Sequence, residues 1–174
     1  MSSNLPKIER TIVRVSTYEL YNSGSLKGEN IDLTMFADKE CFIEHCYSIF
    51  GVDAELMYQD SEGSFAMCIE ESSIPKELFD VFQMKDYDQQ MVWLALSAMD
   101  NPNVEQAVDK HEDVRFIAAD NEREFYELLG DELLEGVDLP PIINGYVDIE
   151  RMGKDESDLN GWHYISQIGG VLLP

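Results

Sequence analysis

The sequence has few positively charged residues, and one long stretch has none. Its 12 lysines and arginines face 35 aspartates and glutamates, which gives a net charge of -23 in 174 residues. Residues 40–75 contain neither lysine nor arginine. Nucleic acids and anionic membranes are bound through basic side chains that neutralise phosphates, so this composition excludes both as partners. A field this negative favours basic protein surfaces instead.

Cysteine and histidine are also scarce, with three of each. Cys41, Cys46 and Cys68 are odd in number and lie among apolar residues, which predicts buried free thiols in a reducing compartment. His45 stands beside Cys46 and one turn from Cys41, but no second ligand pair with zinc spacing follows. We therefore expect no metal site here.

Long apolar runs are missing as well. The longest strongly apolar run, residues 91–99, is too short to cross a bilayer, and the N-terminus has no apolar signal-peptide core. We expect a cytoplasmic protein.

No motif indicates catalysis. The G-S-L-K-G segment from Gly24 to Gly28 is neither a dinucleotide fingerprint nor a P-loop nor a nucleophile elbow, and no calcium-binding loop fits the chain. Among 35 carboxylates, close acid pairs arise by chance and no pair stands out, so a carboxylate-dependent hydrolase ranks third among the functions considered. The sequence predicts a protein that is not an enzyme and has no cofactor.

The acids that are present alternate with apolar residues. Blocks of like charge are typical of tails, whereas isolated acids among apolar residues are typical of folded elements. A composition with 44% hydrophobic and 10% aromatic residues can build a core. Once folded, residues 40–75 hold their carboxylates in fixed positions without a neutralising cation nearby in sequence, at a cost in self-repulsion. We interpret the chain as a scaffold that displays negative charge.

Local patterns predict an α+β fold. The alternation in residues 11–17 predicts a strand, and residues 25–33 a second strand that pairs back on it after a turn at Asn22-Ser23-Gly24. Asp38 and Gly51 are placed to begin and end a helix whose apolar face covers this small sheet. A third strand is predicted at residues 55–59, and helices are predicted at residues 77–84, 88–99 and 104–111.

The last third of the sequence returns to mixed structure. A strand is predicted at residues 114–118, and Asn121 with Glu124 predicts the start of a helix that continues to about residue 135. The apolar stripe of that helix is Phe125, Leu128, Leu129 and Leu133. A further helix at residues 147–154 and a closing hairpin of residues 162–165 and 168–173 around Gly169-Gly170 complete the prediction.

Changes of pattern near Gly63 and within residues 103–112 predict three small domains. Residues 1–63 form an N-terminal domain, a three-stranded antiparallel sheet with a helix. Residues 64–111 form a central helical domain. Residues 112–174 form a C-terminal α+β domain.

The helix predicted after Asn121 carries an acidic stripe. Glu124, Glu127, Asp131 and Glu135 recur at i, i+3, i+7 and i+11. Like charges one turn apart destabilise a helix by a few tenths of a kcal/mol per pair. A cost this small is compatible with acids that bind a partner and equally with acids that only face solvent.

Three segments resemble the ArdA-type antirestriction proteins. Val15–Leu33, V-S-T-Y-E-L-Y-N-S-G-S-L-K-G-E-N-I-D-L, is similar to the opening motif of that family, and Ala54–Asp60, A-E-L-M-Y-Q-D, is similar to the segment after its first helix. Gly145–Asp155, G-Y-V-D-I-E-R-M-G-K-D, is a third match near the end. The chain departs from the pattern at Asn30 and Ser61, where aromatic residues are expected.

This resemblance implies a DNA mimic encoded on mobile elements. It implies an elongated chain of three domains that forms a homodimer through its C-terminal region and has neither active site nor cofactor. The partner it implies is the methyltransferase core of type I restriction-modification enzymes, whose DNA-binding groove the mimic occupies. An acidic adaptor or chaperone for another basic protein is the alternative. The carboxylates expected to imitate phosphates are Glu40, Glu44, Asp53, Glu55, Asp60, Glu62, Glu70, Glu71, Asp109, Glu112, Asp113, Glu122, Glu124, Glu127, Asp131, Glu132, Glu135 and Asp138.

Overall fold

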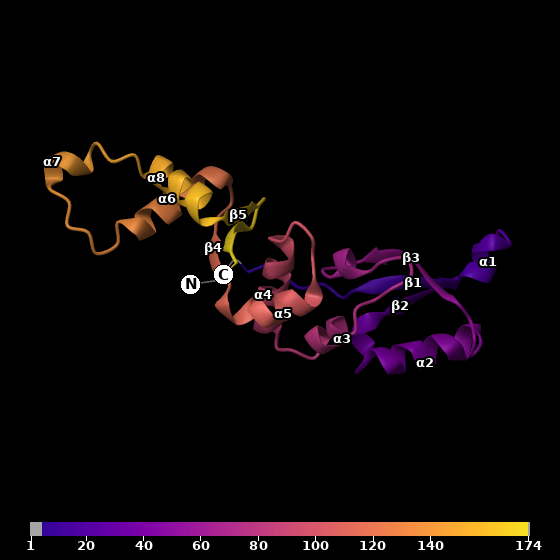
Figure 1. Ribbon diagram of the computed structural model, residues 1–174. Helices are drawn as coiled ribbons and strands as arrows, with labels where there is room; N and C mark the ends of the chain where they lie inside the picture. Colours follow the sequence, from indigo (N-terminus) through magenta and orange to yellow (C-terminus); the bar gives the residue numbers. More distant parts are fainter. Residues whose placement is uncertain (1–4, 174) are drawn as a thin grey trace. The chain divides into compact units, whose positions relative to one another are not determined.

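A computed structural model describes residues 5–173, which belong to two compact units (Figure 1). The N-terminal unit is Lys7–His111, and the C-terminal unit holds residues 112–173 together with residues 5 and 6. The predicted α+β class is confirmed: a three-stranded antiparallel sheet is followed by a helical middle region and then by a second sheet with helices. The predicted three-domain division and the elongated arrangement stay predictions.

The first sheet has the order β2-β1-β3, with every pair antiparallel. Alternation along the central strand directs Val13 and Val15 into the core, where both are fully buried. The second strand is shorter than predicted: its pairing with β1 begins at Glu29, and before it the Leu26 carbonyl accepts from the guanidinium of Arg14 at 2.8 Å. The strands are β1 (Ile12–Thr17), β2 (Glu29–Asp32) and β3 (Leu56–Glu62).

Two helices belong to this sheet. The short α1 (Tyr18–Asn22) follows β1 directly, where a turn alone was predicted. The predicted limits of α2 (Lys39–Phe50) are confirmed: the carboxylate of Asp38 accepts from the Cys41 N–H at 2.7 Å, and Gly51 ends the helix with φ +107°. Such a positive φ favours glycine because an L side chain is strained there.

The helical middle region shares its aromatic core with α2. The rings of Phe42 and Phe79 lie 5.8 Å apart, and those of Phe65 and Phe82 lie 5.9 Å apart. The indole N–H of Trp93 donates to the Ser64 carbonyl at 2.8 Å, which ties the region to the end of β3. Its helices are α3 (Glu77–Phe82), α4 (Asp86–Ser97) and α5 (Val104–Lys110), and 3₁₀ turns lie at Leu33–Met35, Ala66–Cys68 and His111–Asp113.

The second sheet has the antiparallel order β4-β6-β5. Its predicted hairpin exists, but the prediction of its turn was wrong. The chain reverses at Gln167, which has φ +63°, and Gly170 lies inside a strand. A Cβ on Gly170 would lie 1.9 Å from the Phe125 ring, so glycine is needed there for packing. The strands are β4 (Arg115–Ala118), β5 (Trp162–Ile165) and β6 (Gly169–Leu172).

Two helices of twelve residues accompany this sheet, α6 (Glu122–Leu133) and α8 (Ile149–Asn160). The short α7 (Pro141–Asn144) lies in the loop between them (Figure 1). Phe125 and Leu129 of α6 are buried against the sheet, beside Trp162. The predicted apolar stripe was too wide, because Leu128 and Leu133 are each 40% exposed.

The helix pair packs backbone to backbone. A Cβ on Gly130 of α6 would lie 2.1 Å from the Ile149 carbonyl, and one on Gly153 of α8 would lie 1.8 Å from the Tyr126 carbonyl. Only glycine permits these approaches. Helix α8 continues beyond Lys154, where the sequence predicted its end, and ends at Gly161, which has φ +73°.

The expectation of three buried thiols was wrong for one of them. Cys46 and Cys68 are buried, and burial raises their thiol pKa to about 12 and about 11. Cys41 is exposed on α2. Within residues 5–173, no helix is long and apolar enough to cross a bilayer.

Candidate functional site

The eight acids of residues 40–75 all lie at the surface. Glu40 and Glu44 are one turn apart on α2, and Asp60 and Glu62 lie on β3. Among residues 5–173, none of the eight forms an ion pair. All eight are exposed: Glu40, Glu44, Asp53, Glu55, Asp60, Glu62, Glu70 and Glu71.

Arg14 lies near two of these acids, but its guanidinium is hydrogen-bonded to other groups. Arg14, Asp60 and Glu62 line one shallow depression of the first sheet. The guanidinium of Arg14 donates to the Leu26 carbonyl at 2.8 Å and to the Asn30 side chain at 3.4 Å. Among the described residues, neither Asp60 nor Glu62 of β3 forms an ion pair with Arg14. Asn30 and Ser61, the two departures from the family pattern, also line this depression.

One acid of this stretch has a neighbouring phenol. Partial removal from water and a hydrogen bond to Glu71 raise the pKa of Tyr18, and the charges of Glu71 and Glu55 act in the same direction. Removal from water is the largest of these causes, and the nearby carboxylates add to it.

The predicted acids that follow are distributed over three short elements. Asp109 is exposed on α5, and Glu112 and Asp113 are exposed in the 3₁₀ turn after it. Glu135 and Asp138 are exposed in the loop after α6.

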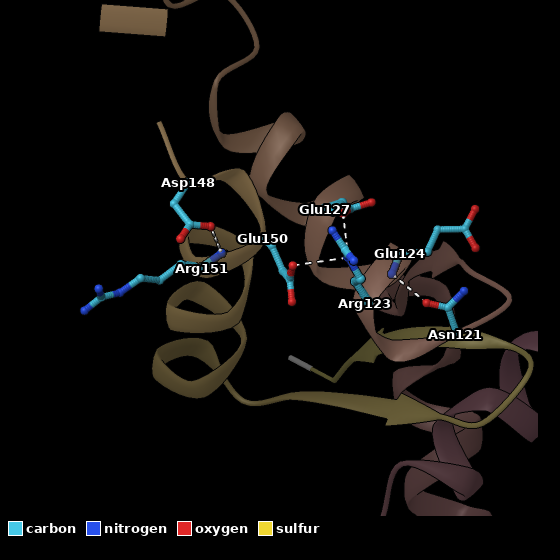
Figure 2. Close-up of polar contacts among 7 residues, drawn as sticks. All are labelled: Asn121, Arg123, Glu124, Glu127, Asp148, Glu150 and Arg151. Carbon is cyan, nitrogen blue, oxygen red and sulfur yellow. Dashed lines mark hydrogen bonds and ion pairs between the residues drawn. The ribbon is translucent and has the colours of Figure 1, made fainter. Parts of the chain in front are cut away.

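The start of α6 organises its first carboxylates. The Asn121 side chain accepts from the Glu124 N–H at 3.0 Å, as the predicted capping arrangement requires (Figure 2). The carboxylate of Glu124 accepts from the Asp120 N–H at 2.9 Å, and that of Glu122 accepts from the Tyr126 hydroxyl at 2.8 Å. These bonds hold the two acids in defined positions, and Asp131 is exposed one turn after Glu127.

One arginine joins α6 to α8. The Arg123 Nε lies 2.9 Å from an oxygen of Glu127 and 3.2 Å from an oxygen of Glu150 (Figure 2). The hydrogen bond to Glu127 and the charges of both carboxylates raise the pKa of Arg123, so its guanidinium stays charged at physiological pH.

Three further ion pairs link one cation to one acid. Arg115 pairs with Glu132, and its guanidinium lies 5.3 Å from the ring centroid of Trp162. Along α8, Arg151 lies 3.9 Å from Asp155 and Lys154 lies 2.8 Å from Asp158. A carboxylate in such a pair offers less negative charge to a partner than an unpaired one.

The sequence prediction missed the acids of α8. Because the predicted helix ended at Lys154, Asp155 and Asp158 were not placed on a helical surface. The i, i+4 spacing of Arg151 with Asp155 and of Lys154 with Asp158 is the signal that could have extended it. No pattern in the sequence predicts the ion pair between Arg123 and Glu150, because the two residues lie on different helices.

These surfaces are suited to contact with cations. The depressions that contain predicted acids are shallow and lined by both polar and apolar side chains. Within residues 5–173, no group of histidine, cysteine, aspartate and glutamate side chains could hold a metal ion. What the arrangement offers chemically is an array of anions on two folded units.

Comparison with known proteins gives one family. A family model described as antirestriction protein (ArdA) matches residues 13–167. No curated protein matches the chain.

Proposed function

The chain belongs to the ArdA family of antirestriction proteins, and from that premise we propose that it inhibits type I restriction-modification enzymes by imitating DNA. In this proposal, surface aspartates and glutamates take the place of phosphates in the DNA-binding groove of the methyltransferase core. The observation that carries it is the exposure of all eight acids of residues 40–75, with no ion pair to any of them among the described residues.

The amount of charge is sufficient for such a role. Duplex DNA carries one negative charge per roughly 1.7 Å of helix axis. The net charge of -23 therefore equals that of about 40 Å of duplex. Basic side chains in the groove displace counterions when they bind the phosphates of DNA. They would bind these carboxylates by the same electrostatic attraction.

A mimic of this kind requires no chemical step. We propose that the protein acts stoichiometrically, by occupying the groove, and not as an enzyme. The proposed partner-binding residues are the eighteen acids predicted from the sequence, and all of them are exposed except Glu124 and Glu127, which are half-buried.

We also propose that the protein is a homodimer formed through its C-terminal unit. Two large apolar side chains in the loop between α6 and α8 support this: Ile142 is 78% and Tyr146 is 87% exposed. A substitution of Tyr146→Asp should shift the sedimenting species from dimer to monomer. A wild-type protein that sediments as a monomer at micromolar concentration would contradict the proposed dimer.

The function is tested by titrating the protein into a type I enzyme that is cleaving unmodified DNA. We expect cleavage to stop near one equivalent of protein per DNA-binding groove, and we expect the protein to bind the isolated methyltransferase core. Equal affinity for an unrelated basic protein such as lysozyme would instead indicate a general acidic adaptor. Neither inhibition nor binding when the protein is in excess over a panel of type I enzymes would overturn the proposal.

A further inference from the structure

The bridge made by Arg123 differs from the other ion pairs of the C-terminal unit. Those pairs join one cation to one acid, whereas Arg123 joins two acids on different helices, Glu127 of α6 and Glu150 of α8. The group formed by the three side chains keeps a net charge of -1. It therefore remains an anion on the surface while its two carboxylates are held by one guanidinium.

The bridge fixes the spacing of two carboxylates. Their oxygens both lie within 3.2 Å of the same nitrogen, so these oxygens are no more than about 6 Å apart. Like charges this close repel each other, and without the guanidinium the flexible glutamate side chains would separate. The helices themselves stay in place, because Gly130 and Gly153 set the approach of their backbones.

The surroundings of the bridge are also acidic. Glu127 and Glu150 line one shallow depression together with Asp131 and Asp148, and Arg123 lies on its wall. The Asp148 carboxylate is occupied at the start of α8, where it accepts from the Arg151 N–H at 3.0 Å (Figure 2). Among the residues that line this depression, the positive charge comes from Arg123 alone.

We propose that Arg123 is a positioning residue for inhibition: it holds the carboxylates of Glu127 and Glu150 at the separation in which they meet cations of the restriction enzyme. This inference rests on the proposed function. It has an unusual consequence, because removal of a positive charge from a protein that imitates an anion should make it a weaker inhibitor.

The bridge contributes little to folding, and this makes its role measurable. The side chains of Arg123, Glu127 and Glu150 are 71%, 45% and 46% exposed, and exposed ion pairs add little to stability. An Arg123→Gln protein should keep the thermal midpoint and the α6 and α8 hydrogen-exchange protection of the wild type.

The chain offers a matched control. Arg151→Gln removes the same charge from a side chain that is 78% exposed, and both variants have a net charge of -24. Arg151 pairs within its own helix, and Figure 2 shows its side chain extending away from the Arg123 bridge. Its substitution removes charge without disturbing a pair of acids.

The experiment compares inhibition constants for cleavage by one type I enzyme. We expect Arg123→Gln to inhibit about fivefold more weakly than the wild type, Arg151→Gln to inhibit equally or slightly better, and Arg123→Lys to come within about twofold of the wild type, since lysine restores the charge. Arg123→Gln in a Glu150→Gln background should change the constant by less than about twofold, because the pair to be positioned is already gone.

Several results would overturn the inference. Inhibition by Arg123→Gln as strong as by Arg151→Gln would show that net charge alone matters. A fivefold loss that persists in the Glu150→Gln background would show that Arg123 acts without Glu150. In both cases the wild type still inhibits, so the proposed function survives. Absence of inhibition by the wild type would instead end both proposals.

Discussion

The two units treat their acids differently. In residues 40–75 of the N-terminal unit, the carboxylates are exposed, and none of them is ion-paired among the described residues. In the C-terminal unit, four cations on β4, α6 and α8 pair with Glu127, Glu132, Glu150, Asp155 and Asp158. Elsewhere in the first unit Asp32 and Glu77 are ion-paired, so the contrast is between the unpaired acids of residues 40–75 and the five paired acids of the second unit.

This difference shows that net charge and available charge are separate quantities. A carboxylate beside a guanidinium still counts in the formal charge but attracts a partner's cation less strongly. In the first unit, an aromatic core shared by Phe42 and Phe79 supports the unpaired acids. In the second unit, glycine contacts and ion pairs order the acids. We therefore expect the carboxylates of the first unit to attract the partner's cations. We expect those of the second unit to fix the positions at which the cations bind.

The largest expected effect is on the helix pair of the C-terminal unit. Gly153→Ala places a Cβ 1.8 Å from the Tyr126 carbonyl, so α6 and α8 must move apart. We expect a loss of about 3 kcal/mol in the free energy of unfolding. Hydrogen exchange should accelerate in α6 and α8 and not in β1 or β3.

Gly145→Ala is the control for this substitution. Nothing lies within 4 Å of a Cβ built there, and its φ of -72° suits alanine, so stability should be unchanged or slightly raised. Equal destabilisation by the two alanines would refute the close helix contact.

The next prediction compares unpaired with paired acids. A triple variant Glu44→Gln, Asp53→Asn, Asp60→Asn removes three exposed carboxylates of the N-terminal unit. We expect inhibition to weaken about tenfold or more, since each neutralised charge removes a contact with a cation. Thermal unfolding should show no loss of stability, because repulsion is relieved.

The matched triple removes the same kinds of residue from ion pairs. Glu132→Gln, Asp155→Asn, Asp158→Asn also gives a net charge of -20 but takes acids that are already paired. Inhibition should weaken less than about threefold. If the two triples lose inhibition equally, the distinction between the units has no functional meaning.

A smaller effect is expected on the reactivity of Cys41, which lies close to unpaired acids. A hydrogen bond to Asp38, partial burial and the charges of Asp38, Glu44 and Glu40 raise the pKa of the Cys41 thiol. A raised pKa means less thiolate at neutral pH, so alkylation of Cys41 by neutral iodoacetamide should be slow and should speed up as the pH rises.

Neutralising one of these charges tests the attribution. Glu44→Gln should increase the alkylation rate of Cys41 about twofold at low salt and less at high salt, where charges are screened. Glu105→Gln, an exposed acid of α5 that does not act on this thiol, should leave the rate unchanged. The same acceleration in both variants would rule out a local field.

The smallest effects should come from single acids. Glu124→Gln and Asp131→Asn should each change inhibition by less than about twofold, because a mimic spreads its binding energy over many charges, whereas Glu127→Gln also breaks the Arg123 bridge and should lose no more than Arg123→Gln. Inhibition constants for the three variants measure this directly. A loss of 100-fold or more from one of them would indicate a catalytic carboxylate instead.

Much of the fold could be predicted from the sequence, because its signals are local. Asp38 and Gly51 mark the ends of α2, and Asn121 marks the start of α6, through contacts between residues close in the chain. Alternation in β1 predicts that Val13 and Val15 are buried. The exposure of the acids followed from their polarity, and the family followed from short motifs.

The features that could not be predicted depend on distant residues. The need for glycine at position 170 inside a strand follows from the Phe125 ring, and the close approach of α8 to α6 depends on Gly130 and Gly153. The bridge from Arg123 to Glu150 joins side chains 27 positions apart. Periodicity carries no information on such contacts, since it records only which face of one element is apolar.

The most direct test of DNA mimicry is a competition between the protein and duplex DNA for one groove. A labelled duplex with the recognition site is bound to the methyltransferase core, and its fluorescence anisotropy is followed as the protein is added. We predict complete displacement, with a midpoint that rises in proportion to the duplex concentration. A stable complex of core, duplex and protein together would contradict the proposal, because two occupants of one groove exclude each other.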